Sequence, residues 1–487
     1  MSNRNTLEAE ISRDIYMGQI PVLSNERIYD FKGVTLTSCG MGIASWCYVQ
    51  GAWLSSVLPL GLTLFVSIVP MLLLTLIMLL LTAIPTKYGV DNSLMQKAVF
   101  GSRLAKIIFM VLIFSAVGWF SINAQIFATS FSNICLAFGV TVSGKWFPII
   151  LLIFLLVAFL ITIRGPQFVK YTMYIMVPCI VVVGLAMLIK ALTTTTWEEL
   201  NNVELLSAGF FPSRKIAFLA MCEGMFVFAT AWYASLGQFS RLTTKSTYSL
   251  WGQTIGFCLI MEFFIIIGAI TGALMAQNGI YSDNPTDWMI SVAGPIWGVL
   301  SLVAIGLANV STQVSGLYAW IIATKSYWNK LNTTAVAVFW SLYCFLLAVW
   351  NGVWTYYSAF VAVIGATASV ATAILLADYF IVRKGKFSLG AIYELPGRTA
   401  YKYSGGFNII ALIIFILGSA LYLYVYDPIN YVSRNDFLML FTPSGISMIF
   451  AFCSYVGLSK IPAINKYLLA DRKEIEACEN RLEPHID

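Results

Sequence analysis

The sequence has few charged residues for its length. Of its 487 residues, 11% are Asp, Glu, Lys or Arg and 59% are hydrophobic, whereas a soluble domain carries roughly 25% charged residues. Such a chain cannot cover a water-facing surface, so we expect an integral membrane protein embedded in the lipid bilayer. The net charge of +6 then indicates orientation in the membrane, and no nucleic-acid partner is expected.

Histidine is almost absent as well. The single one, His485, lies in the C-terminal tail, which excludes histidine-based metal sites and Ser-His-Asp chemistry in the membrane. The nine cysteines form no C-x-x-C pair, and most lie in apolar runs, where cysteine behaves as a small hydrophobe. We therefore expect no disulfide framework, no metal cluster, no cofactor and no enzyme. The first 33 residues are too polar for a cleavable signal peptide.

What the chain has instead is long apolar runs. A helix needs about 20 mostly apolar residues to cross the hydrocarbon core, and twelve continuous runs qualify. They are 34–56, 59–84, 107–138, 146–163, 171–190, 216–236, 251–276, 294–324, 334–352, 357–382, 405–425 and 438–458. Because the runs are continuous rather than alternating, they predict an all-α membrane protein with 12 transmembrane helices, not a barrel.

The basic residues fix the expected topology. All but five of the 29 lysines and arginines fall on one side of the predicted membrane, and the exceptions are Lys145, Lys190, Arg214, Lys215 and Arg434. We expect both termini in the cytoplasm and a location in the plasma (inner) membrane. The predicted organisation is an N-terminal segment (1–33), helices 1–5 (34–190), helices 6–10 (191–382), a loop with helices 11–12 (383–458) and a tail (459–487).

The eighth run is unusually polar in its middle, "IGLANVSTQVSGLYAW". At 100° per residue, Ala308, Ser311, Thr312 and Ser315 share one face, and Asn309 and Gln313 share a neighbouring one. Hydroxyl and carbonyl oxygens suit a hard cation such as Na⁺, whereas amides suit a polar, uncharged solute. Small and hydroxyl residues also permit close helix packing, but five polar residues in this arrangement favour function.

Helices 1 and 6 are interrupted by glycines. Helix 1 reads "SCGMGIASWCYVQGAW" and helix 6 reads "EGMFVFATAWYASLGQFSR". Broken helices at corresponding places in two five-helix halves are a sequence indication of a transporter site, although glycine alone also serves packing. Helix 3 adds Trp119 and Asn123 to this picture, and an aromatic side chain there is a platform on which a flat ring can stack.

Three acidic residues lie in or near the predicted membrane. Glu223 and Glu262 are candidates for proton coupling by default, and a structural partner for each is an equal alternative. Asp378 lies five residues before Arg383, and we expect this pair to anchor or gate the inner end of helix 10.

These residues resemble the nucleobase–cation symporter-1 family, which includes cytosine and purine-cytosine permeases. The resemblance runs from about Ile20 through helix 10. Its most specific pieces are "VGWF" (117–120), "QFSR" (238–241), "GLYA" (316–319) and "LLADYFIVRKG" (375–385). It implies the LeuT-type fold, which is a five-plus-five inverted repeat followed by two C-terminal helices.

The resemblance also implies functional positions. A sodium site would fall on Gly40, Ile43, Ala308, Ser311 and Thr312. A substrate site would fall on Ala44, Ser45, Trp46, Trp119, Asn123, Phe228, Ala229, Thr230 and Gln313. Two departures from the family pattern weaken cytosine as the substrate. In helix 6, Ala229 replaces the usual aromatic residue and Gln238 the usual Asp, and in helix 3, Ala116 replaces a Gln. With Ala229 at the usual aromatic position, Phe228, Trp232 or Trp46 would form the platform.

The sequence therefore predicts a monomeric secondary active importer of a nucleobase or similar heterocycle, in symport with Na⁺ or H⁺. An importer of hydantoin, allantoin or an amino acid on the same fold remains an alternative, and a channel or a non-transporting sensor is a distant one.

Overall fold

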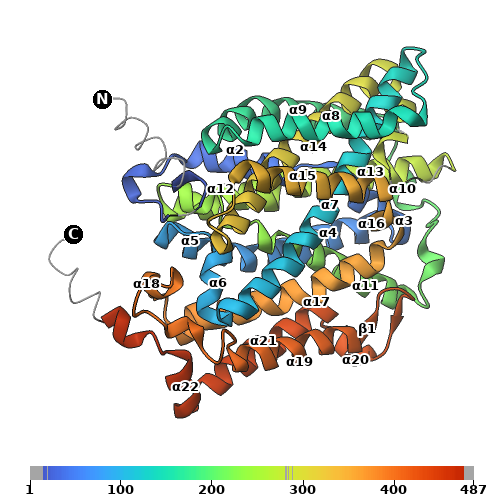
Figure 1. The fold of residues 1–487 in the computed structure, drawn as a ribbon. Coiled ribbons are helices and arrows are strands. Elements are labelled where there is room, and N and C mark those ends of the chain that lie inside the picture. The colour runs from blue at the N-terminus through green and yellow to red at the C-terminus, as the bar shows by residue number, and fades with distance from the viewer. Residues whose placement is uncertain (1–14, 19, 280–281, 283, 288, 477–487) are drawn as a thin grey trace, which may run out of the picture.

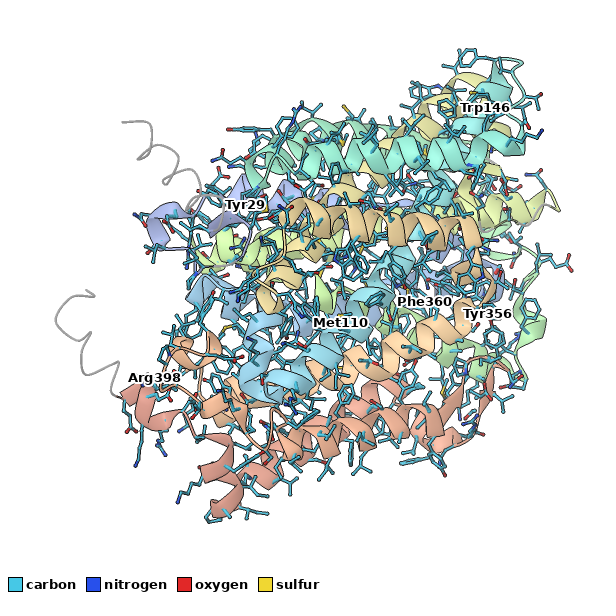
Figure 2. All side chains as sticks on the ribbon, in the orientation of Figure 1. Tyr29, Met110, Trp146, Tyr356, Phe360 and Arg398 are labelled. Atoms are coloured by element: carbon cyan, nitrogen blue, oxygen red, sulfur yellow. The ribbon has the colours of Figure 1, made fainter. Side chains whose placement is uncertain are left out.

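The chain folds into a bundle of long helices that run between two ends (Figure 1). The computed structural model describes residues 15–476, apart from 19, 280, 281, 283 and 288. His485, Cys478 and the ends of the predicted N-terminal segment and tail lie outside the described residues. Tyr29 and Arg398 lie at one end, here called the inner end, and Trp146 and Tyr356 lie at the other, the outer end (Figure 2).

Regular structure in the described residues is almost entirely α-helical, with one two-stranded hairpin. The helices of the first half are α2 (Phe31–Gly42), α3 (Ser45–Val57), α4 (Leu60–Leu79), α5 (Ala83–Tyr88), α6 (Asn92–Phe100), α7 (Ser102–Ala137), α8 (Phe147–Thr162), α9 (Pro166–Thr194) and α10 (Trp197–Asn201). Those that follow are α11 (Arg214–Thr230), α12 (Ser246–Thr254), α13 (Met261–Gln277), α14 (Met289–Tyr327), α15 (Thr333–Trp350), α16 (Gly352–Thr355), α17 (Tyr357–Leu376), α18 (Leu389–Ile392), α19 (Ile409–Val425), α20 (Asp436–Met439), α21 (Pro443–Ser459) and α22 (Pro462–Leu468). The hairpin pairs β1 (Tyr426–Asp427) with β2 (Val432–Ser433).

Within the described residues, nine helices are long and apolar enough to cross a membrane. A tenth is added if α21 and α22, which are bent by 106°, are taken as one span. The predicted first span is divided between α2 and α3, and the predicted eleventh is the 17-residue α19. Each of these is shorter than the roughly 20 residues of a straight spanning helix, so the number 12 stays a prediction.

Both predicted helix breaks are present. Helix 1 breaks at Ile43 and Ala44, which have extended backbone between α2 and α3. Helix 6 loses α-helical geometry after Thr230, and the chain continues in short 3₁₀ turns as far as Leu242. Gly237 lies in this stretch with φ of +112°, a conformation that glycine adopts without steric cost.

The outer half of helix 1 is packed on helix 7 backbone to backbone. A Cβ atom at Gly51 of α3 would lie 2.0 Å from the Ile265 carbonyl oxygen of α13, and one at Gly268 would lie 2.5 Å from the Tyr48 carbonyl oxygen. Only glycine permits this approach. This close packing against α13 fixes the position of α3, which forms part of the wall of a central cavity described below. Helix α14 packs against α2, α7, α8 and α9.

Candidate functional site

The polar middle of α14 meets the broken end of α2. The Thr312 hydroxyl lies 3.1 Å from the Gly40 carbonyl oxygen and 2.7 Å from that of Ile43. The Ser311 hydroxyl lies 2.9 Å from the Gly40 carbonyl oxygen and 2.8 Å from that of Ala308. Five neutral oxygen atoms therefore converge in a buried position, and they belong to the five residues of the predicted ion site.

The helix break explains why these carbonyls are available. The last four carbonyls of a helix have no partner within it, and α2 ends at Gly42. The hydroxyls of α14 lie against one of these carbonyls, that of Gly40, and against that of Ile43, the residue that follows the helix. The donor set contains only oxygen and no carboxylate, which suits a hard monovalent cation more than a transition metal. By its donor chemistry, the cluster fits Na⁺.

A second polar network lies beside this cluster and joins helices 1, 3 and 8. The Asn309 side chain accepts a hydrogen bond from the Ser45 backbone N–H (3.0 Å) and donates one to the Asn123 carbonyl oxygen (3.2 Å). The Ser45 hydroxyl donates to the Asn123 side-chain oxygen (2.8 Å). Asn309 thus provides a hydrogen-bond acceptor for a backbone N–H in the first turn of α3, which has no partner within that helix. Two predicted substrate residues, Ser45 and Asn123, are in direct contact here.

Four of the predicted aromatic residues form a cluster. The Trp46 ring packs edge-on against Trp119 (centroids 6.1 Å apart) and Trp232 (5.6 Å), and Trp119 packs edge-on against Phe228 (5.8 Å). Tyr357 of α17 adds a further edge contact to Trp119 at 5.5 Å. The indole N–H groups of Trp46 and Trp119 are buried and have no hydrogen-bond partner among the described residues, so each would have to become exposed before it could donate to a ligand.

A cavity of about 480 Å³ lies above this cluster and reaches the outer end. Trp46, Trp119 and Phe228 form its floor, and they also line a second, water-sized space of about 20 Å³ beneath it. Tyr356, labelled at the outer end in Figure 2, lines the mouth. The size is that of a site for a small organic molecule, and the wall is mainly apolar and aromatic, as ligand sites usually are.

The other predicted substrate residues do not line the cavity, and they are Ala44, Ser45, Asn123, Ala229, Thr230, Trp232 and Gln313. Gln313 is fully buried, its amide nitrogen lies 3.8 Å from the Cys344 sulfur atom, and its side-chain oxygen has no partner among the described residues. Ala44 forms the break in helix 1, and Ala229 and Thr230 are buried at the end of α11. The Thr230 hydroxyl donates to the Val227 carbonyl oxygen (3.1 Å).

The two buried glutamates have different surroundings. Both oxygens of Glu223 accept hydrogen bonds from Ser444, one from its backbone N–H (2.9 Å) and one from its hydroxyl (2.6 Å). Ser444 is at the start of α21, so Glu223 caps that helix from α11. By contrast, neither oxygen of Glu262 has a hydrogen-bond partner in the described part of the chain. The Ser67 hydroxyl, which faces Glu262, donates to the Leu64 carbonyl oxygen.

The inner end is closed by the segment that precedes α2. The fully buried Arg241 guanidinium donates to the carbonyl oxygens of Ile15 (2.9 Å) and Tyr16 (2.7 Å), and the Tyr318 hydroxyl donates to the same Tyr16 oxygen. Backbone N–H groups of Ile28 and Tyr29 donate to the Leu242 carbonyl oxygen. The cavity is therefore open toward the outer end and sealed from the inner one.

Asp91, between α5 and α6, gives this closed end a pH dependence. Its carboxyl is 2% exposed, and burial raises its pKa from 3.8 to about 6. The folded chain thus binds a proton that the unfolded chain releases, so the free energy of unfolding should fall as the pH rises from about 4 to 6. Asp91→Asn should remove this part of the slope. Thermal unfolding followed across that pH range tests it, and an unchanged slope would contradict it.

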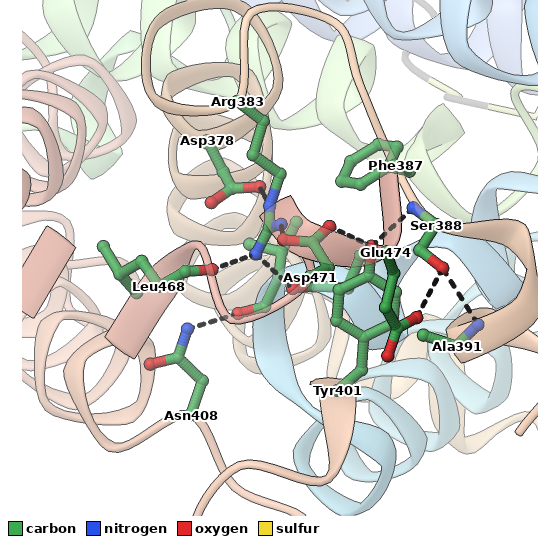
Figure 3. Close-up of polar contacts among 12 residues, drawn as sticks. Asp378, Arg383, Phe387, Ser388, Ala391, Tyr401, Asn408, Leu468, Asp471 and Glu474 are labelled. Carbon is green, nitrogen blue, oxygen red and sulfur yellow. Dashed lines mark hydrogen bonds and ion pairs between the residues drawn. The ribbon is translucent and has the colours of Figure 1, made fainter. Parts of the chain in front are cut away.

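Asp378 and Arg383 form part of a buried ion cluster at the inner end (Figure 3). The Arg383 guanidinium donates to Asp378 (2.7 Å) and to Asp471, and also to the Leu468 carbonyl oxygen. The Tyr455 hydroxyl donates to the second oxygen of Asp378 (2.7 Å). The end of helix 10 is thereby joined to the segment after α22, which agrees with the expected anchoring role.

Sequence reasoning gave no role to several residues that line the cavity. Gln50 on α3 and Tyr357 and Ser358 on α17 are among them. A glutamine in an apolar helix is visible in the sequence as a candidate functional residue. In the structure the Gln50 amide nitrogen lies 3.5 Å from the Met225 sulfur atom. Tyr357 had no such signal, because its position opposite Trp119 depends on how α17 packs against α7.

A broken first helix, a hydroxyl-lined cluster beside the break and a central cavity open to one end together define a transporter of the LeuT-type fold. The chain belongs to the nucleobase–cation symporter-1 family, because residues 27–442 match the family described as "Permease for cytosine/purines, uracil, thiamine, allantoin". This confirms the resemblance stated from the motifs.

Two relatives and two solved structures illustrate the match. The putative allantoin permease of Escherichia coli (strain K12) is 24% identical over 419 residues, which cover 79% of this chain and 82% of the relative. The purine-uracil permease NCS1 of Arabidopsis thaliana is 24% identical over 197 residues, 38% of this chain, and the match spans only 32% of the plant protein.

The structures agree on the fold. Mhp1, a nucleobase-cation-symport-1 family transporter in a closed conformation with bromovinylhydantoin bound, has a TM-score of 0.72 and 18% identity, and the match covers 92% of this chain and 98% of Mhp1. A Na⁺-coupled sialic acid symporter has a TM-score of 0.62 and 13% identity, with 92% and 93% covered.

Proposed function

We propose that the protein imports a nucleobase or a closely related small heterocycle by alternating access, coupled to a cation. The observation that carries the proposal is the convergence of five neutral oxygens at the helix 1 break, next to a cavity with an aromatic floor. The substrate classes named for the family and for its relatives support a flat, amide-rich ring as the solute. Hydantoin and allantoin stay within the proposal.

The substrate ring would contact the aromatic floor of Trp46, Trp119 and Phe228, with Trp232 packed against Trp46 and lining the smaller space. Ala44, Ser45, Asn123, Ala229, Thr230 and Gln313 would support or read the ring around the break, after a local closure that brings the buried amides to it. Ion binding between helices 1 and 8 would stabilise the outward-open state and so raise substrate affinity by linkage. Helices 1, 2, 6 and 7 would then rock against helices 3, 4, 8 and 9.

The location follows from the same proposal. An importer of this kind would lie in the plasma membrane with the inner end facing the cytoplasm, which puts both termini there. We expect it to act as a monomer, with the solute, the ion and the bilayer as its partners.

Na⁺ is the favoured coupling ion, because Gly40, Ile43, Ala308, Ser311 and Thr312 supply only neutral oxygens. Thr312→Ala removes the hydroxyl that lies against the carbonyl oxygens of Gly40 and Ile43. The variant should need at least tenfold more Na⁺, because the loss of one ligand to a charged group costs about 1.5–3 kcal/mol. The measurement is substrate binding as a function of NaCl concentration. Thr271→Ala, which removes a buried hydroxyl bonded to carbonyls of its own helix, α13, is the control.

Proton coupling is the second candidate, and the unpartnered Glu262 favours it. A buried carboxyl group without a partner in the membrane is neutral or functional, whereas Glu223 already caps α21. If protons drive transport, Glu262→Gln should abolish pH-driven uptake and Thr312→Ala should leave it unchanged. The opposite pattern would assign the coupling to Na⁺.

The first experiment is a thermal-shift screen with nucleobases, hydantoins, allantoin and amino acids, in NaCl and in choline chloride. A ligand that binds only the native state raises its stability by mass action. A shift for one heterocycle that is larger in NaCl would support the whole proposal. Shifts with amino acids alone would mean that the substrate is an amino acid and not a heterocycle. A channel or a sensor would give no counterflow of the bound solute in proteoliposomes.

A further inference from the structure

Three aromatic rings from distant parts of the chain meet at the mouth of the cavity. They are Trp53 of α3, Phe210 in the 3₁₀ turn Ala208–Phe210, and Tyr431 in the turn between β1 and β2. Phe210 stacks on Trp53 with centroids 6.5 Å apart and planes 25° apart, and on Tyr431 with 6.4 Å and 26°. Phe210 is thus the middle ring of a stack of three.

The two outer rings of this stack are well supported. Trp53 stands on α3, which glycines hold against α13. The Tyr431 ring also packs on Phe211 (4.8 Å), and its hydroxyl is hydrogen-bonded to that of Ser358 on α17 (3.3 Å). Tyr431 has a left-handed backbone with φ of 55°, a conformation that a bulky residue keeps only where the surrounding structure requires it.

The middle ring is held less firmly. Phe210 is 61% exposed, although a ring of this size usually buries its surface. Its two stacking distances are near the upper end of the 4.5–7 Å range for aromatic pairs. Trp53 and Tyr431 line the cavity, and Phe210 is not among the residues that line it. Moving Phe210 toward solvent would leave a slot between two ring faces that is continuous with the cavity.

The cavity is also larger than one ring requires. Its volume of about 480 Å³ lies in the range that holds a drug-sized molecule, and the aromatic floor occupies only its deep end. Trp53 and Tyr431 belong to the opposite, outer part. Aromatic residues at membrane interfaces commonly anchor a protein in lipid, but Trp53 and Tyr431 pack against the two sides of Phe210 and line the cavity.

We propose that Trp53 and Tyr431 form a second, outer binding site that takes a planar heterocycle in place of the Phe210 ring. The solute would stack there first, on its way to the floor at Trp46, Trp119 and Phe228. This inference rests on the proposed function, since it needs a flat solute. Stacking does not depend on edge hydrogen bonds, so the outer site would be less selective than the inner one.

The test is equilibrium dialysis of the purified full-length protein with radiolabelled uracil and, separately, hypoxanthine. At saturation, the wild type should bind two rings per chain. Trp119→Ala should leave one ring because the inner site is lost, and Trp53→Ala or Tyr431→Ala should leave one ring because the outer site is lost. Phe210→Ala should keep two rings and tighten the weaker site at least about fivefold, because the competing ring is gone.

Phe437→Ala is the matched control, because Phe437 is 68% exposed and belongs to α20, at the outer end. It should change neither stoichiometry nor affinity. A single ring per chain in both the wild type and Phe210→Ala would overturn the outer site, as would two rings in both Trp53→Ala and Tyr431→Ala. Binding of neither probe, together with no thermal shift for hydantoin or allantoin, would overturn the proposed function, and the outer site with it.

Discussion

Replacing Arg383 by glutamine should lower the free energy of unfolding by about 3–5 kcal/mol, the usual cost of removing one partner from a buried ion pair. Arg383 is 4% exposed and balances two carboxylates, Asp378 and Asp471, that are both fully buried. Without the guanidinium, two negative charges would remain close together away from water. Thermal unfolding in detergent should report this as a large drop in Tm.

Arg434→Gln is the control for the loss of an arginine. Arg434 pairs with Asp427 at 2.9 Å, but half of its side chain is exposed, and exposed pairs contribute about 0–1 kcal/mol. If Arg383→Gln does not accumulate, the triple variant Arg383→Met, Asp378→Asn, Asp471→Asn removes the unpaired charges and should recover much of the stability. A Tm for Arg383→Gln equal to that of Arg434→Gln would contradict the prediction.

The ion cluster also shows where sequence reasoning stops. Asp378 and Arg383 are five residues apart and could be paired from the sequence, because one helical turn brings them together. Asp471 is 88 residues from Arg383 along the chain and belongs to a charged tail that looks solvent-exposed in the sequence. Only the packing of α21 and α22 against the end of helix 10 makes it a buried partner.

The oxygen cluster at the helix 1 break could be foreseen for a similar reason. The 3.6-residue period puts Ala308, Ser311 and Thr312 on one face of helix 8 without any tertiary information, and glycines mark the break in helix 1. The composition of the cavity wall was harder to foresee. It depends on rotation of whole helices about their axes, which brought Gln50 and Tyr357 to the cavity and turned Gln313 toward Cys344 instead.

The roles of the two glutamates could not be separated from sequence either. Both are single acids in apolar helices, so the cost of burying each charge looks the same. What distinguishes them is the start of α21, where the Ser444 N–H and hydroxyl donate to Glu223. The hydroxyl that faces Glu262, that of Ser67, donates to the Leu64 carbonyl oxygen instead.

Trp119→Ala should reduce heterocycle affinity by about 5- to 150-fold, which corresponds to the 1–3 kcal/mol of one stacked base. Trp119 connects the other two rings of the floor, Trp46 and Phe228, and also contacts Tyr357 and Phe360. The four centroid distances are 5.4–6.1 Å. It also lines both the 480 Å³ cavity and the smaller space beneath it. No other residue of the floor has as many ring neighbours.

The variant must be separated from a general loss of packing, because truncating a buried tryptophan costs about 3–5 kcal/mol of stability anywhere in a core. Trp320→Ala is the matched control. Trp320 is fully buried on α14, its ring packs on Phe120 at 4.6 Å, and it does not line the cavity. Both variants should lose similar stability, but only Trp119→Ala should lose affinity for the heterocycle, measured by titration below the Tm of each variant. If both lose affinity equally, the floor at Trp119 is structural and the ring binds elsewhere.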